Sequence, residues 1–216
     1  AFRKTKGEVI GTAGAAPGAS TQLGVITFQG SDSNSWEVGG QIEARSDGAW
    51  SNGVAPTKIT FKTCADGLSL DPRMTIKKDG RIGIGTESPS GLLHLTSSED
   101  GAPSFYLENT HGNGNAATMK FLKNGDSAAA SDNCGRIQFA GENDNVSPEQ
   151  YNFAEIRGSS QSIVDGDECG ALHFELLHDG VQKSIFEMSA NGQGAVAQGT
   201  ITFNEQANDY DFRVES

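Results

Sequence analysis

Two stretches of this chain repeat one another: residues 24–30 read Gly-Val-Ile-Thr-Phe-Gln-Gly, and residues 135–141 read Gly-Arg-Ile-Gln-Phe-Ala-Gly. Three further matches follow in the same order and at a nearly constant spacing. This regularity indicates a duplicated β-rich unit, and arrays of such units usually supply reach, stiffness or display rather than chemistry. The further matches pair Glu43-Ala44-Arg45 with Glu155-Ile156-Arg157, residues 59–61 with 172–174, and residues 74–80 with 186–192.

Apolar and polar residues alternate with a period of two in most of the matched stretches, which is typical of half-buried antiparallel strands. Dipeptides that favour tight turns, such as Asp79-Gly80 and Asn191-Gly192, separate these stretches. No segment combines helix start and stop signals with a period of 3.6 residues. We therefore predict an all-β fold of tandem antiparallel modules, each of β-sandwich or β-prism type.

The duplication predicts three regions. Residues 1–89 form a first module with incomplete opening strands, residues 90–199 form a second and homologous module, and residues 200–216 begin a further module or a linker. Phe2-Arg3-Lys4 precedes the first unit much as Phe121-Leu122-Lys123 precedes the second. Both ends therefore read as if cut from a longer array.

The composition predicts an intertwined homotrimer. Glycine accounts for 28 of the 216 residues and hydrophobic residues for only 35%, so each unit has a thin core and would be marginal as a monomer. Gly83 and Gly85 alternate with isoleucines. One strand face there is bare backbone, which allows other chains to approach closely at a threefold axis.

Charge and cysteine usage exclude several classes of partner. The net charge of −12 argues against nucleic acid and against an anionic membrane surface. No window approaches the 18 or so apolar residues of a membrane-spanning helix. Cys64, Cys134 and Cys169 form neither a disulfide framework nor a zinc motif, so we expect free thiols, no metal and no cofactor.

The junction between the units carries a family resemblance. Residues 79–89 read Asp-Gly-Arg-Ile-Gly-Ile-Gly-Thr-Glu-Ser-Pro, and Leu92-Leu93-His94-Leu95 follows. This resembles a signature that recurs in bacteriophage tail fibres and related large fibre proteins, including those of phages of marine and photosynthetic bacteria. The second unit departs from the signature, because residues 193–196 read Gln-Gly-Ala-Val in place of the Gly-Ile-Gly-Thr run.

The resemblance implies a structural segment of a fibre shaft that displays a distal host-receptor-binding region. The chain would be assembled in the host cytoplasm, reside in the virion, and contact other virion tail proteins. Two alternatives remain open: a fibre module whose own loops hold a host cell-surface glycan, and a repeat segment of a bacterial surface adhesin.

Glu43 and Glu155 are the candidate carboxylates for hydrolysis, since the repeat keeps both and glycosidases need a pair of acids. Each lies two residues before an arginine, Arg45 or Arg157, on the same strand face. Same-face ion pairing accounts for this pattern without chemistry. We therefore expect these four residues to act in structure or trimer contacts, and we expect no enzyme activity.

Other candidate sites lie in loops or near strand ends. Trp36, Trp50 and Tyr151 have side chains suited to stacking on sugar rings, with loop packing as the alternative. The oxygen-rich stretches 142–145 and 165–168 do not have the spacing of a calcium-binding loop, so solvated turns are the preferred interpretation.

Overall fold

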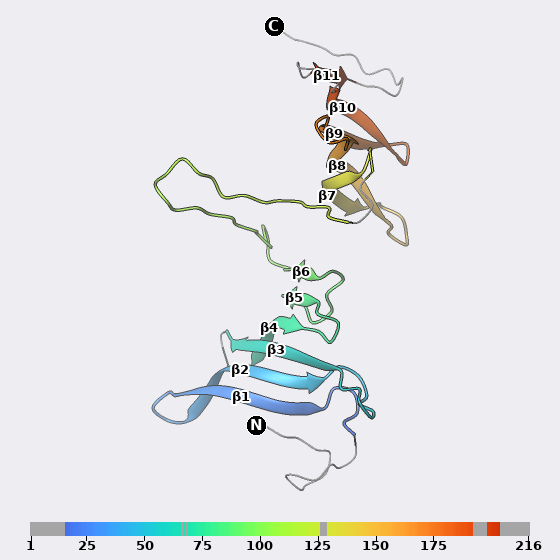
Figure 1. Ribbon diagram of the computed structural model, residues 1–216. Coiled ribbons are helices and arrows are strands. Elements are labelled where there is room, and N and C mark those ends of the chain that lie inside the picture. The colour runs from blue at the N-terminus through green and yellow to red at the C-terminus, as the bar shows by residue number, and fades with distance from the viewer. Residues whose placement is uncertain (1–15, 66, 68, 126–128, 192–197, 204–216) are drawn as a thin grey trace. The chain divides into compact units, whose positions relative to one another are not determined.

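The computed structural model describes residues 16–65, 67, 69–125, 129–191 and 198–203. The described chain contains strands and turns and no helix, which confirms the all-β prediction (Figure 1). It divides into two compact units, Ala1–Tyr106 and Leu107–Ser216, each built on one sheet.

The first sheet has six strands whose order in the sheet follows their order in the chain. Strands β1 to β5 are joined as an antiparallel meander, and β6 lies parallel to β5. The pairing of β6 places residues beyond 89 in the first sheet, although we expected that module to end there. The strands are β1 (Gln22–Ser31), β2 (Trp36–Ser46), β3 (Thr57–Cys64), β4 (Leu70–Ile76), β5 (Ile82–Ile84) and β6 (Leu93–Leu95).

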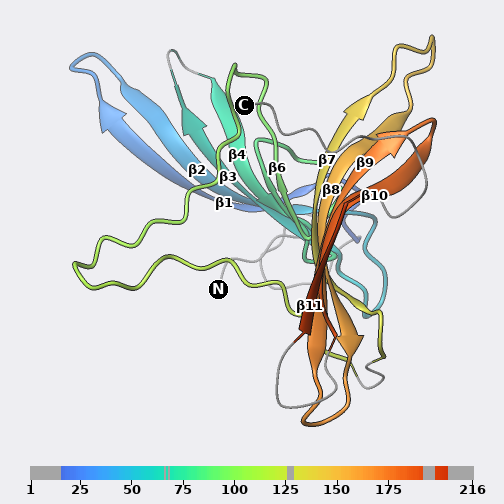
Figure 2. The same cartoon turned by 90° about the horizontal axis from the view of Figure 1, so that it is seen from above.

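The second sheet has five antiparallel strands, again in sequence order. Figure 2 shows the strands within each sheet lying one behind another with a progressive rotation, the usual right-handed twist of a sheet. The strands are β7 (Asn133–Glu142), β8 (Gln150–Ser162), β9 (Cys169–His178), β10 (Val181–Asn191) and β11 (Gln198–Phe203).

The two sheets repeat each other in detail. The register of β1 on β2 is interrupted next to Phe28, and that of β7 on β8 is interrupted next to Phe139. Phe61 faces Met74 across β3 and β4, as Phe174 faces Phe186 across β9 and β10. The matches predicted for these strands therefore agree with the strand pairings.

One predicted match is out of register by two residues. In the first sheet Ile42 lies between Ile26 and Phe61, and in the second Ile156 lies between Ile137 and Phe174. Ile42 and Ile156 are thus equivalent, so Glu43 corresponds to Arg157 and not to Glu155. A two-residue shift keeps every side chain on the same face, which is why the alternation in the sequence did not expose the error.

The end of the second sheet also differs from the expectation. β11 pairs with β10 as β5 pairs with β4, so residues 198–203 belong to the second sheet, where we had expected a new strand pair to begin. The position of the Gly-Ile-Gly-Thr run is therefore filled by β11. The stretches 2–4, 193–196 and 204–216, on which other expectations rested, lie outside the described residues.

Candidate functional site

Each sheet has one continuous apolar face that the described chain leaves largely uncovered. Ile26, Ile42, Phe61, Met74 and Ile84 follow one another across β1 to β5 on that face. No valine, leucine, isoleucine, phenylalanine or methionine among the described residues is fully buried. An uncovered apolar face of this extent marks a site of association.

The second sheet presents the same kind of face. Ile137, Ile156, Phe174, Phe186 and Phe203 follow one another across its five strands. Phe186 contacts both phenylalanine neighbours, with ring centroids 5.5 Å from Phe174 and 5.1 Å from Phe203. The equivalent residues Phe28 and Phe139 are 55% and 52% exposed, so both units leave the same position open.

The opposite face of the first sheet is polar and holds a buried carboxylate. The Glu43 side chain is only 4% exposed; its Oε1 accepts a hydrogen bond from Arg45 Nε at 2.8 Å. Lys62 Nζ lies 2.7 Å from Oε2 without hydrogen-bond geometry, so this second contact is a charge contact. Two cations thus neutralise one buried acid, as we expected for Arg45.

The second sheet places an equivalent pair with its charges inverted. Arg157 occupies the position of Glu43, and Glu175 that of Lys62. Arg157 Nη2 lies 2.5 Å from Glu175 Oε1, and Arg157 Nε lies 3.7 Å from Glu155 Oε1. Gln138 donates a further hydrogen bond to Glu155 at 2.7 Å. Both sheets therefore keep an ion pair at this position while exchanging its signs.

A serine, a histidine and a glutamate lie beside this pair. Ser159 Oγ is 2.9 Å from His173 Nε2, and His173 Nδ1 is 3.2 Å from Glu187 Oε2. The connectivity is that of a hydrolytic triad. Ser159 and His173 are both buried within the sheet, however, and the first sheet has Arg45, Thr60 and Thr75 at the same positions. We therefore interpret the cluster as hydrogen bonding that satisfies a buried polar row.

Gly83 and Gly85 are explained by contacts within the chain. A Cβ added to Gly83 would lie 2.2 Å from the carbonyl oxygen of Thr86. One added to Gly85, whose φ is +77°, would lie 2.0 Å from that of Thr96. The bare backbone expected from the sequence is present, and the chain's own loops occupy the space beside it. A role in trimer contacts remains a prediction.

Two lysine–carboxylate pairs join the ends of the first sheet's strands. Burial raises the pKa of Asp47, but hydrogen bonds from Lys77 Nζ and from the Lys78 backbone N–H outweigh it, so the pKa lies below its usual value. The hydrogen bond from Lys58 Nζ likewise lowers the pKa of Glu87. Both carboxylates are therefore held ionised in the folded sheet.

The three candidate sugar-stacking residues are divided between the two units. Trp36 is 72% exposed at the start of β2, and Trp50 lies beyond the other end of that strand. Trp50 Nε1 donates to the Pro56 carbonyl at 3.0 Å, which fixes the ring against its own loop. Tyr151 lies in the second unit, where its hydroxyl donates to Glu149, and this bond raises the tyrosine pKa.

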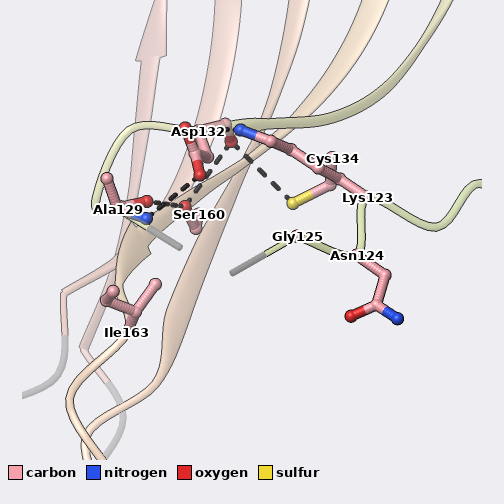
Figure 3. Close-up of a pocket in the computed structure, with 8 residues that line it drawn as sticks. All are labelled: Lys123, Asn124, Gly125, Ala129, Asp132, Cys134, Ser160 and Ile163. Carbon is pink, nitrogen blue, oxygen red and sulfur yellow. Dashed lines mark hydrogen bonds and ion pairs between the residues drawn. The ribbon is translucent and has the colours of Figure 1, made fainter. Parts of the chain in front are cut away.

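A pocket of about 230 Å³ lies beside the start of β7 (Figure 3). Asp132 organises it: Lys123 Nζ lies 2.7 Å from its carboxylate, and the Ala129 N–H donates to the same group. Ser160 closes the pocket by donating to the Ala129 carbonyl, just as Ser46 donates to Gly18 in the first unit. The serine hydrogen bond that borders the pocket therefore has an equivalent in the first unit, where it also lies close to the start of the sheet.

No group of three or more histidine, cysteine, aspartate and glutamate side chains is arranged to hold a metal within the part of the chain that the structure describes. Of the oxygen-rich stretches, Glu142 is the last residue of β7, and residues 143–145 and 165–168 lie between strands. Among the same residues no helix has the length and apolarity needed to cross a membrane.

The comparisons with known proteins concern the fold. Neither a family model nor a curated protein matches this sequence. One similar solved structure is the carboxy-terminal domain of the bacteriophage T5 L-shaped tail fibre, with a TM-score of 0.68 and 11% identity over 98% of this chain and 93% of that one. Another is the same domain with its intra-molecular chaperone domain, with a TM-score of 0.66 and 11% identity over 98% of this chain and 64% of that one. This chain has a phage tail-fibre-like fold.

Proposed function

We propose that this chain is a segment of a virion tail-fibre shaft, assembled as a homotrimer whose apolar sheet faces pack together around the threefold axis. The observation that carries the proposal is the largely uncovered apolar face, which runs across β1 to β5 in the first sheet and β7 to β11 in the second. Burying one phenylalanine contributes about 1.5–3 kcal/mol, and each trimer would bury three copies of every residue on that face.

The strand order supports a shaft. In each sheet the strands follow one another in sequence order, so the chain advances along the sheet by roughly 4.8 Å per strand and does not turn back. A unit built this way continues in one direction, so further units stacked in that direction would lengthen a shaft. The tail-fibre-like fold agrees with this arrangement.

The proposal predicts the effect of placing a charge on either face of one strand. Phe28 lies on the apolar face of β1, and its neighbour Thr27 points to the opposite face. Phe28→Glu should abolish trimer formation because three carboxylates would meet in an apolar interface. Thr27→Glu adds the same charge one residue away and should leave the trimer intact.

Light scattering during gel filtration measures the outcome directly. The wild type should have about three times the chain mass of 22.7 kDa. A folded wild-type monomer would show that the apolar face needs no partner, and a dimer would favour two sheets packed face to face as a sandwich. Either result would refute the trimer.

We also propose that the segment has no catalytic activity. Glu43 and Lys62 are replaced in the second sheet by Arg157 and Glu175, so the repeat keeps opposite charges and not a carboxylate at one position. An arginine at the equivalent position of the second repeat cannot serve as a catalytic acid, whereas an ion pair forms whichever strand carries the positive charge. Oligosaccharide release from host polysaccharide by the wild type, absent from Glu43→Gln or Glu155→Gln, would overturn this assignment.

In this proposal the segment resides in the virion, is assembled in the host cytoplasm with other tail proteins, and presents a distal region to a host receptor. A glycan-binding role is the second candidate, favoured by the exposed indole of Trp36. Glycan arrays with the wild type and Trp36→Ala separate the two functions, with Val146→Ala as a matched control at another exposed apolar residue. A pure shaft segment binds no glycan.

A further inference from the structure

Residues 96–125, which we name the linking segment, follow β6 and form no strand of their own (Figure 1). Connections longer than about 12–15 residues are uncommon in compact domains, and they are usually either functional or linker segments. The middle of the segment is ordered by its own hydrogen bonds: Asn109 Nδ2 donates to the Asn115 carbonyl at 2.8 Å, and Asn109 Oδ1 accepts from the His111 N–H.

The linking segment does not have the composition of a flexible linker. Linkers and disordered segments are poor in aromatic and large aliphatic residues, yet this one carries six large apolar side chains on either side of its ordered middle. All of them are exposed, and Phe105 is 65% exposed. They are Phe105, Tyr106, Leu107, Met119, Phe121 and Leu122.

The second unit has an open apolar groove of about 460 Å³ beside part of this segment. Residues 118–121 form one wall, and Ile137, Ile156 and Leu172 belong to the apolar face of the sheet. Gly135 and Gly158 are paired neighbours and lie in the lining. Phe121 already covers Gly135, because a Cβ there would lie 2.3 Å from the Phe121 Cβ.

We propose that Phe105 and Leu107 of one copy of the chain insert into this groove on a second copy, so that the linking segment is an arm exchanged between the chains of the trimer. The inference rests on the proposed trimer. In an extended segment the two residues point to the same side, as insertion requires. The groove is continuous with the apolar face that the trimer assigns to the other copies.

Charge favours the same occupant. Glu108 follows the two inserting residues, and Lys120 lines the groove. In a chain with a net charge of −12, a groove bordered by a lysine is suited to a segment of another copy that carries a carboxylate. The groove is open, and Phe105 and Leu107 are 65% and 48% exposed.

Photo-crosslinking of the full chain tests the exchange. With p-benzoylphenylalanine in place of Phe105, irradiation should give covalently linked chains on a denaturing gel. Mass spectrometry should place the link within residues 134–137 or 156–158 of the other chain. The same photoreactive residue at Val146, an exposed position outside the linking segment, should give no link to those peptides.

A groove-filling variant serves as the second measurement. A Cβ on Gly158 meets no atom within 4 Å, so Gly158→Leu should fill the groove without disturbing its own chain. We expect the variant to reduce the interchain product at least tenfold while the circular dichroism spectrum is retained. Equal crosslinking in this variant would contradict insertion into the groove.

The oligomeric state separates failure of this inference from failure of the proposed function. A trimer that crosslinks only within one chain, at other residues, or not at all would overturn the exchanged arm and leave the shaft proposal standing. A monomer would overturn both.

Discussion

Because the two sheets carry the same ion pair with opposite signs, the charges of the first sheet should be exchangeable. Glu43→Arg breaks the pair and brings a third cation beside Lys62 and Arg45. Lys62→Glu, added to it, recreates the arginine–glutamate pair that β8 and β9 already contain. We expect the single substitution to destabilise the protein strongly and the double substitution to recover most of the loss.

The exposure of the three side chains determines how much each substitution should change the free energy of unfolding. Breaking a fully buried pair costs about 3–5 kcal/mol. Here the Glu43 side chain is 4% exposed, but Lys62 and Arg45 are 20% and 35% exposed and can turn toward water. We therefore expect Glu43→Arg to cost about 2–3 kcal/mol and Lys62→Glu to restore about 1.5–2 kcal/mol of it. Adding Arg45→Ser, the equivalent of Ser159, should recover the remainder.

Thermal unfolding of all four members of a double-mutant cycle measures the coupling, with the chain concentration held fixed because assembly contributes to stability. A recovery of 2 kcal/mol corresponds to about 4–8 °C in Tm for a chain of this size. Reversal of the exposed pair Arg73–Asp71 is the control, where a change below about 1 kcal/mol is expected. A coupling energy within about 0.5 kcal/mol of zero would refute the idea that pairing, and not residue identity, matters at this position.

Two further predictions concern the first unit. Gly83→Val should lower the melting temperature and the yield of folded protein, because its Cβ would lie 2.2 Å from the Thr86 carbonyl oxygen. Gly39→Val is the control and should be tolerated, because there is open space around Gly39. Equal melting curves for the two variants would contradict the close approach of Thr86 to Gly83. Asp47→Asn should destabilise the protein by about 1 kcal/mol at pH 7, where the lysine pair is intact. Folding lowers the pKa of Asp47 below its usual 3.8, so this contribution to stability is present above that pH and is lost as the pH falls through the folded value. The melting curves of the variant and the wild type should therefore converge in acid. A constant difference from pH 7 to pH 2 would show that the hydrogen bonds to Asp47 do not favour its ionised form.

The sequence alone was sufficient for the fold class and the duplication. Alternation with a period of two depends only on which residues are apolar, and a turn dipeptide such as Asp79-Gly80 acts locally, so both survive without tertiary information. The same alternation assigns Phe28 and Phe139 to one face, and the strand pairings agree.

Only the tertiary structure determined the register between the strands. A shift of two residues preserves the alternation, so the sequence paired Glu43 with Glu155, while the hydrogen-bonded neighbours Ile26 and Phe61 show that Glu43 corresponds to Arg157. The inverted ion pair, the approach of Thr86 to Gly83 and the groove above Gly158 all depend on residues far apart in the chain or on loop geometry. Contacts of this kind leave no periodic signal in a single sequence, because they arise only when separate strands meet.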